Sequence, residues 1–389
     1  MTHQKTKPVV GIITLTQAEN YGTVLQAYAT LKIFQSLTDE LEFSLVPTDW
    51  RYTRWRDFLK MAVPREGRNP IRRFRNYRRM REFIDPFLGN DADYLNIGNA
   101  RAVLTFLRAN YDGLITGSDE IWNMRYKGAD QVYLLTPDIR MYHAAYATSA
   151  NRLNFTNLDI DGKRRMGEAL LAYDRIYVRD GNTANVVDTL TGSCIRQSRI
   201  IDPTITYEFA ELRRDVPARG GNSPRKKRIL VMASSHFVVD QLLNKFGHEA
   251  EIHSIFIGHR GTTFIDADPV QFLNMFKDYD VIVSQFFHGV CMSIKSGRPF
   301  VGFDLAADYP NVESKIKSIL TLLDLSSNYH RLTDKDAISI VNHVSEALDG
   351  GRNIPASVKL RVDAERTQAW DAAKQIVDDL HARLAAHSL

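Results

Sequence analysis

The chain has 389 residues, of which 44% are apolar and 25% charged, so it can bury more than one core and its length favours two domains. The formal net charge of +4 is modest, but residues 51–81 are dense in arginine with few acids. The two cysteines, Cys194 and Cys291, lie far apart, which argues against a disulfide framework or a zinc site and favours a reducing compartment.

A strand followed by a helix is predicted at the start of the chain. Residues 8–15 (PVVGIITL) form an apolar run, and residues 23–37 (TVLQAYATLKIFQSL) carry apolar side chains at helical spacing. The run near the amino terminus is too short for a signal peptide, and no window reaches the length of a membrane span. We expect a cytoplasmic protein.

The arginine-rich segment, residues 50–82, mixes basic and aromatic side chains. Residues 49–64 (DWRYTRWRDFLKMAVP) suit peripheral contact with an anionic membrane at the inner face of the plasma membrane. A solvated helix over the core explains them equally well. No nucleic acid partner is expected, because no zinc-finger, helix-turn-helix or RNA-binding motif accompanies the arginines.

Three further apolar runs, at 113–122, 141–150 and 175–190, each end in small and polar residues. The first ends in GSDEIW, where Asp119 or Glu120 could bind or deprotonate sugar hydroxyls while Trp122 stacks on the ring. Ser118 and Asp119 are also common helix caps, which leaves a purely structural interpretation open.

The third run begins with RIYVRD, which places Arg179 and Asp180 at the end of a predicted strand. Arg179 could bind a carboxylate or a phosphate with two hydrogen bonds. A local ion pair between Arg179 and Asp180 is the alternative.

A change of composition divides the chain. Residues 200–228 pass from a strand-like run into a segment rich in Pro, Gly and charge, as expected of a linker, and βα patterns resume at 228–236, 252–259, 279–289 and 298–304. We predict an amino-terminal α/β domain over 1–207 and a second one over 208–350. Residues 351–389 are predicted to form a helical tail that packs back on the first domain.

The segment VIVSQFFHGVCMSIKSGRPFVGFD, residues 281–304, places a histidine between two apolar runs. His288 would lie at the carboxyl end of a strand beside a helix amino terminus, where open α/β sheets bind ligands and free N–H groups favour anions. A satisfied loop histidine is the alternative. Cys291, facing the core from the same helix, is expected to be inert.

Together these segments resemble the polysaccharide pyruvyl transferase family. NYGTVLQAYAT (20–30) is similar to its Asn-Tyr-Gly loop and following helix, and ITGSDEIWN to its Gly-Ser-Asp-Gln-x-Trp-Asn motif. YATSA, VRD and IDPTI resemble its small-residue and mid-chain motifs, and SQFFHGVCMSIKSGRPFVGF its Ser-x-x-Phe-His-Gly motif. The motifs occur in the family's order between about residues 9 and 325.

The resemblance implies two facing Rossmann-like domains, similar to the GT-B glycosyltransferases, with the active site in the cleft between them. It implies transfer of pyruvate from phosphoenolpyruvate to two hydroxyls of a sugar, on a surface polysaccharide or its lipid-linked precursor, with no metal or organic cofactor. It assigns Arg179, Ser284, His288 and Gly289 to the donor site. His288 is the expected acid or phosphate partner and Asp119 the expected base, while Asn20, Tyr21, Ser118, Glu120 and Trp122 are assigned to the acceptor side.

Two positions depart from the family pattern. Phe286 stands where many members have arginine and others serine, and Glu120 replaces glutamine. The missing cation could come from Lys295, Arg298, Lys315 or Lys317. A GT-B glycosyltransferase that uses a nucleotide sugar, or a non-catalytic glycan-binding protein, are the competing functions.

Overall fold

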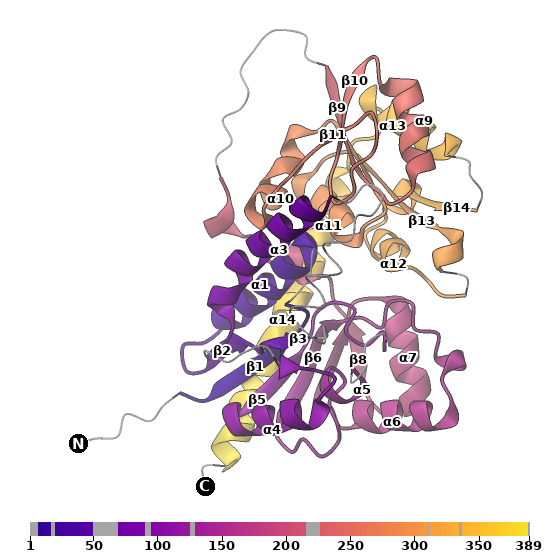
Figure 1. Ribbon diagram of the computed structural model, residues 1–389. Coiled ribbons are helices and arrows are strands. Elements are labelled where there is room, and N and C mark those ends of the chain that lie inside the picture. The colour runs from indigo at the N-terminus through magenta and orange to yellow at the C-terminus, as the bar shows by residue number, and fades with distance from the viewer. Residues whose placement is uncertain are drawn as a thin grey trace.

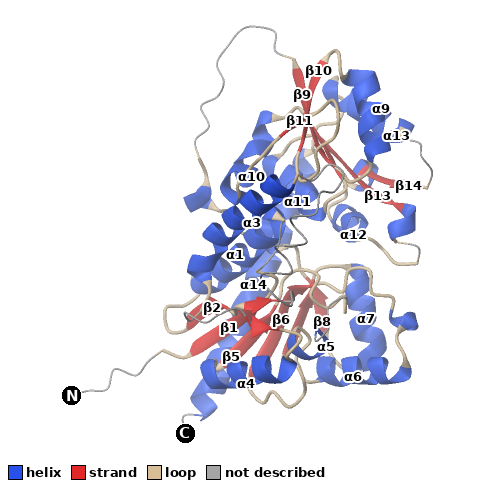
Figure 2. Cartoon of the chain, in the orientation of Figure 1, coloured by secondary structure: helices blue, strands red, loops and turns tan. Residues whose placement is uncertain are grey.

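The computed structural model describes residues 7–16, 20–49, 69–89, 95–124, 129–214, 226–309, 311–333 and 337–387 (Figure 1). Two six-stranded sheets, each flanked by helices, lie one above the other (Figure 2). All their strand pairs are parallel, which confirms the predicted pair of Rossmann-like domains.

The first sheet has the strand order β2-β1-β5-β6-β7-β8. Its strands are β1 (Val9–Ile13), β2 (Glu42–Leu45), β5 (Gly113–Thr116), β6 (Tyr142–Thr148), β7 (Arg175–Val178) and β8 (Gln197–Arg199). A small separate sheet pairs β3 (Thr48–Asp49) with β4 (Leu95–Asn96). The helices are α1 (Tyr21–Gln35), α3 (Pro70–Ile84), α4 (Ala100–Asn110), α5 (Ala129–Val132), α6 (Ile160–Leu171), α7 (Gly181–Thr191) and α8 (Pro203–Thr206).

The second sheet has the order β11-β10-β9-β12-β13-β14. Its strands are β9 (Lys227–Met232), β10 (Ala250–Ser254), β11 (Thr263–Phe264), β12 (Val281–Ser284), β13 (Phe300–Leu305) and β14 (Tyr329–Leu332). Its helices are α9 (His236–Phe246), α10 (Pro269–Met275), α11 (Phe287–Ser296), α12 (Lys315–Leu322) and α13 (Ile338–Leu348), and the chain ends in α14 (Ala356–His387).

Both faces of each sheet are apolar because helices cover both. Along β1, Ile12 packs toward α1 and α14, whereas the next residue, Ile13, packs toward α4, as the alternation of a strand requires. The core on the α1 side continues into the second domain through α8, α10 and α11. One hydrophobic core therefore joins the two domains.

The contact between α1 and α11 is unusually close. A Cβ atom added at Gly22 of α1 would lie 2.2 Å from both Cβ and Cγ of His288 on α11. Beside it, the Tyr21 ring stacks on Phe272 with centroids 5.1 Å apart and lies 5.0 Å from Phe256. The absence of a side chain at Gly22 thus sets the distance between the domains at His288.

The carboxyl-terminal tail is a single helix, α14, that crosses from the second domain to the first (Figure 1, yellow). Its Ala369 carbonyl accepts a hydrogen bond of 3.1 Å from the Tyr146 hydroxyl of β6, and Asp379 pairs with Arg175 of β7. Its apolar side chains Ile376 and Leu380 are fully buried. The tail therefore contributes to the core of the first domain.

Part of the arginine-rich segment, residues 50–68, and most of the Pro- and Gly-rich linker, residues 215–225, lie outside the described residues. The rest of the arginine-rich segment forms α3. There Arg75 and Arg79 pair with Asp266 of the second domain, with Arg79 Nη1 3.0 Å from Oδ1. Two arginines of α3 thus have an acidic partner across the domain boundary, whereas Arg78 and Arg81 pair locally with Glu82 and Asp85.

Candidate active site

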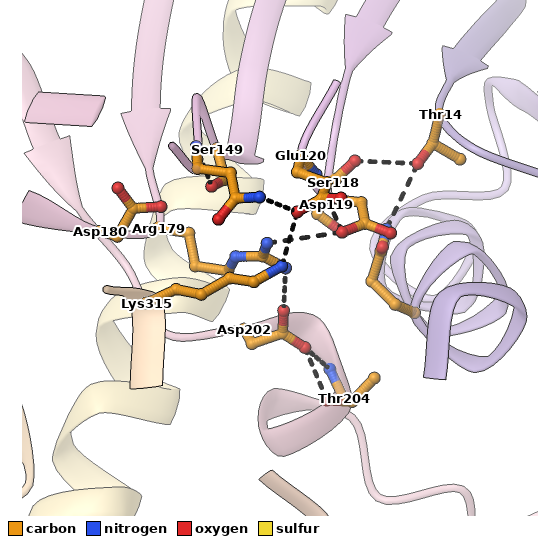
Figure 3. A network of polar contacts seen from close by, with 12 residues as sticks. Thr14, Ser118, Asp119, Glu120, Ser149, Arg179, Asp180, Asp202, Thr204 and Lys315 are labelled. Atoms are coloured by element: carbon orange, nitrogen blue, oxygen red, sulfur yellow. Dashed lines mark hydrogen bonds and ion pairs between the residues drawn. The ribbon is translucent and has the colours of Figure 1, made fainter. Parts of the chain in front are cut away.

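The candidate active site lies where the carboxyl ends of the two sheets face each other. From the first sheet, the segments after β5, β7 and β8 supply Asp119, Arg179 and Asp202. From the second, the start of α11 supplies His288, and the start of α12 supplies Lys315. Figure 3 shows the resulting network of buried polar contacts, which centres on the Arg179 guanidinium.

Arg179 is paired with two carboxylates. Its Nη1 donates to Asp202 Oδ2 at 2.7 Å, and its Nη2 lies 3.5 Å from Asp119 Oδ1. Its guanidinium also lies 4.6 Å from the centroid of Phe287. Burial would lower the pKa of Arg179, but the carboxylates raise it, so it stays charged.

The predicted local pair between Arg179 and Asp180 does not form. Asp180 instead caps α7, where it accepts hydrogen bonds from the backbone N–H and the hydroxyl of Thr183. The partner that replaces it, Asp202, caps α8 and accepts from the N–H and hydroxyl of Thr204. Asp202 was missed from the sequence, although aspartate directly before proline marks a helix start.

Asp119 is a carboxylate held by its neighbours. Its side chain accepts a 2.8 Å bond from the Glu120 N–H, and its backbone has φ 78°, a left-handed conformation that places the side chain toward Arg179. Burial alone would raise its pKa, but the charges of Arg179 and Lys315 and the hydrogen bond from the Glu120 N–H outweigh this and lower it to about 2. A carboxylate this acidic is a weak proton acceptor at neutral pH. Asp119 is therefore better suited to orienting Arg179 than to the predicted role of general base.

Lys315 is the cation that reaches the site. Its Nζ lies 2.8 Å from Glu120 Oε2 and 5.5 Å from the Phe287 centroid. Burial would lower its pKa, but Glu120 raises it, so the lysine is charged. Glu120 also accepts from the Asn151 amide. The charge that glutamate adds at position 120 is therefore matched from the second domain.

The other candidate cations point elsewhere. Lys295 donates to the carbonyls of Ile205 and Tyr207, and Arg298 to that of Lys277, whereas Lys317 is exposed on α12.

His288 lies in the first turn of α11 and is only 5% exposed. Its Nε2 atom is buried without a hydrogen-bond partner among the described residues. Burial lowers its pKa below the ordinary value, and Asp202 and Asp119 oppose this only in part. The imidazole is therefore neutral at pH 7, and its free nitrogen is an unusual feature in a buried site.

Ser284 and Gly289 shape the turn that carries His288. The Ser284 hydroxyl accepts from the Phe286 N–H at 3.1 Å and donates to the Phe286 carbonyl at 2.8 Å. A Cβ at Gly289 would lie 2.3 Å from that hydroxyl and 2.4 Å from Met232 Cε. Both residues thus position α11, and the serine hydroxyl is already occupied.

The prediction that Trp122 stacks on a sugar ring is wrong. Trp122 is fully buried, donates its indole N–H to the Tyr133 carbonyl at 3.1 Å, and packs edge-on against Tyr173. The alternative of a helix cap is wrong as well, because residues 120–123 form turns and the next described helix starts at Ala129.

Ser118 also faces the interior. Its hydroxyl lies 3.2 Å from that of Thr30 on α1, and its carbonyl accepts from the Thr14 hydroxyl (Figure 3). It cannot contact an acceptor in this arrangement.

Asn20 and Tyr21 lie at the start of α1, directly before Gly22 in the chain. Asn20 caps the helix through a 2.9 Å bond from the Gly22 N–H. Both residues line a cavity of about 240 Å³ whose wall includes Phe286. Tyr21 precedes Gly22, which contacts His288, and Phe286 precedes His288 by two residues. The cavity therefore lies next to His288.

Further bonds across the domain boundary surround the site. Arg152 pairs with Asp308 at 3.2 Å, and the hydroxyl of Ser318 accepts from the Gly181 N–H and from Arg199. Cys291 is buried, and burial raises its pKa well above the ordinary value, in line with an inert thiol.

The fold is similar to that of several solved structures that share little sequence with the chain. Sucrose-phosphate synthase of Thermosynechococcus elongatus matches with a TM-score of 0.56 at 10% identity, over 98% of this chain and 100% of the other. The UDP complex of MnaA from S. aureus matches with a TM-score of 0.52 at 10% identity, over 88% of each chain. UDP-GlcNAc 2-epimerase of Methanocaldococcus jannaschii matches with a TM-score of 0.50 at 10% identity, over 93% and 99%.

At such identities the likeness concerns the fold alone. No curated protein sequence matches the chain. The family model of polysaccharide pyruvyl transferase, however, matches residues 20–306, which include Asp119, Arg179, Asp202 and His288. On this match, the chain belongs to the polysaccharide pyruvyl transferase family.

Proposed function

We propose that this protein transfers the pyruvyl group of phosphoenolpyruvate to two hydroxyls of a sugar, forming a cyclic pyruvate ketal on a surface polysaccharide or its lipid-linked precursor. Family membership supports a transferase. The observation that carries the proposal is the buried Nε2 of His288, which has no hydrogen-bond partner in the part of the chain that the structure describes and lies near the cations Arg179 and Lys315. Such a group can exchange a proton with a bound anion.

The reaction balances without a redox partner. One sugar hydroxyl and then the second form bonds to C2 of the donor, and the bond from C2 to the phosphate oxygen breaks. Of the two protons that the hydroxyls lose, one adds to the donor methylene to make the methyl group and the other leaves on phosphate. As the family resemblance implies, we expect no metal or organic cofactor, with phosphoenolpyruvate as co-substrate.

The charges of the site assign roles to its residues. In the free protein Arg179 and Lys315 face three carboxylates, those of Asp119, Glu120 and Asp202. An anionic donor added to this set is favourable only if positive charge comes with it. Protonation of His288 supplies that charge. His288 is then the acid beside the leaving phosphate, while Lys315 and Arg179 stabilise the donor's charge.

Titration calorimetry of phosphoenolpyruvate into the purified protein tests the proposal without knowledge of the acceptor. Saturable binding that is lost in His288→Ala, with unchanged circular dichroism, would support it. UDP-sugars are titrated in parallel. Saturable binding of a UDP-sugar in place of phosphoenolpyruvate would overturn the proposal in favour of a glycosyltransferase.

A lipid-linked acceptor would bring the protein to a membrane surface. Among the described helices, none is both long and apolar enough to cross a bilayer. We propose peripheral contact with an anionic membrane through the basic segment, residues 50–82, of which residues 50–68 lie outside the described residues. Sedimentation with anionic vesicles should decrease with salt and on reversing the charges of Arg51, Arg54 and Arg56. Equal sedimentation of both proteins would contradict it.

A further inference from the structure

The cavity beside Phe286 has the chemistry of a sugar site. It is bordered by α3, the start of α1, strand β11 and the segments that follow β10, β11 and β12. Its volume of about 240 Å³ would hold about eight water molecules, which is enough for one sugar ring. The family match and the buried charged network do not assign it a role.

One wall of this cavity is aromatic. Phe256, Phe264 and Phe286 line it and are each only half-buried, although residues of this type are usually covered. The rings of Phe256 and Phe286 lie 5.1 Å apart, and Phe256 adopts φ 70°, a conformation that bulky residues rarely accept. Apolar ring faces at a polar cavity suit the C–H face of a sugar.

The side of the cavity formed by α3 is basic. Arg72 of α3 is exposed, and its guanidinium lies 4.5 Å from the Phe264 centroid. Among the described residues no carboxylate pairs with Arg72, because the one acid that lines the cavity, Asp266, is held by Arg75 and Arg79. The cavity therefore presents a guanidinium, already oriented by an aromatic ring, that can bind a phosphate or carboxylate group.

The position of the cavity links it to His288. Phe286 precedes His288 by two residues, and Tyr21, which also lines the cavity, precedes Gly22, whose backbone contacts His288. The Asn20 side chain uses its oxygen to cap α1, which leaves its amide N–H groups for hydroxyls of a ligand.

From these observations we infer that the cavity between α3 and the second sheet is the acceptor subsite, binding one sugar ring that carries an anionic group. The aromatic wall holds the ring, Asn20 binds its hydroxyls, and Arg72 binds the anion. This inference rests on the proposed transfer reaction. It replaces the acceptor site predicted around Ser118 and Trp122, whose side chains are buried.

The test uses the full-length protein and a panel of hexose 1-phosphates and hexuronic acids, with inorganic phosphate and methyl glycosides as partial ligands. Comparing the phosphates with the uronic acids distinguishes an acceptor whose anionic group is a phosphate from one whose anionic group is a carboxylate. At least one panel member should bind, and more tightly than either partial ligand. Arg72→Gln and Phe264→Ala should each weaken that binding by about tenfold, the loss of one charge-assisted contact. Arg78→Gln, on the same helix but outside the cavity lining, is the matched control and should bind as wild type.

Phosphoenolpyruvate affinity separates this inference from the proposed function. It should stay unchanged in Arg72→Gln, because the donor is assigned to His288 and Arg179. A fall in phosphoenolpyruvate affinity in Arg72→Gln would place the donor in the cavity and overturn the inference. Failure of every panel member to bind would overturn it as well, whereas loss of phosphoenolpyruvate binding in His288→Ala bears only on the proposed function.

Discussion

The substitution Gly22→Ala tests whether the close crossing of α1 and α11 sets the position of His288. The new methyl group would lie 2.2 Å from Cβ and Cγ of His288 and 2.4 Å from Nδ1, where ordinary contact begins near 3.4 Å. These atoms are close to the α11 backbone and cannot swing aside. The two helices must therefore separate by more than about 1 Å, the scale of misplacement that can cost about 100-fold in rate.

Stability should change less than binding in this variant. Overpacking costs about 1–3 kcal/mol, but alanine is favoured over glycine inside a helix by about 1 kcal/mol. The net loss in free energy of unfolding is then at most about 2 kcal/mol, and the protein should fold. Denaturant titration measures the loss in free energy of unfolding. Titration with phosphoenolpyruvate reports the displacement of His288, which should appear as a large fall in affinity.

Two further variants make the argument specific. Gly162→Ala, in the first turn of α6, adds a methyl group that crowds only the exposed Asp159 carboxylate, which caps that helix, and it should leave donor binding unchanged. Gly22→Ala combined with His288→Gly removes the atoms that clash and should recover the stability lost in Gly22→Ala. Unchanged donor affinity in Gly22→Ala, or no recovery in the double variant, would show that the contact at Gly22 does not set the position of His288.

Three other predictions concern the charges and thiols around the site. Lys315→Gln should lower the free energy of unfolding by about 1–3 kcal/mol, because it leaves the largely buried charge of Glu120 without its partner. Adding Glu120→Gln should restore most of that free energy. Equal losses in denaturant titrations of the single and the double variant would contradict the pairing. His288 should take up a proton when phosphoenolpyruvate binds, since the donor's charge raises a pKa that burial holds below 6.5, so affinity should fall as the pH rises through the pKa of the complex. Calorimetry in buffers of different ionisation heat should show this uptake in wild type and not in His288→Gln. N-ethylmaleimide should modify Cys194 and spare the buried Cys291 in the folded protein, and equal labelling by mass spectrometry would count against the packing of α11.

The strands and the position of His288 could be predicted from local patterns. A buried parallel strand is a short apolar run bounded by polar and small residues, and residues 113–116 and 281–284 fit that description. The turn after such a strand lies at the ligand-binding edge of the sheet. His288 and Arg179 were therefore placed at this edge from the sequence alone.

The partners of these residues could not be predicted, because they depend on contacts distant in sequence. Lys315 reaches Glu120 across 195 positions, and nothing local distinguishes it from Lys317 two residues later. Trp122 was misassigned because a local motif of carboxylate and aromatic residues does not show whether the aromatic ring faces the cleft or the core. Gly22 did carry a signal, since a glycine inside a helix often marks close approach of another segment.

The proposed acceptor cavity also could not be predicted, because its walls come from segments distant in sequence. Arg72 belongs to a basic segment whose composition fits a membrane surface, yet in α3 it lies on Phe264 of the second domain. The aromatic wall is drawn from β11 and from the segments that follow β10 and β12, so no contiguous motif marks it.

The most direct measurement is a crystal structure of the protein soaked with phosphoenolpyruvate. We expect the phosphate and carboxylate to lie between Lys315, Arg179 and the start of α11, with the phosphate within hydrogen-bond distance of His288 Nε2. Donor density in the cavity beside Arg72 and Phe286, with His288 still unpartnered, would contradict it.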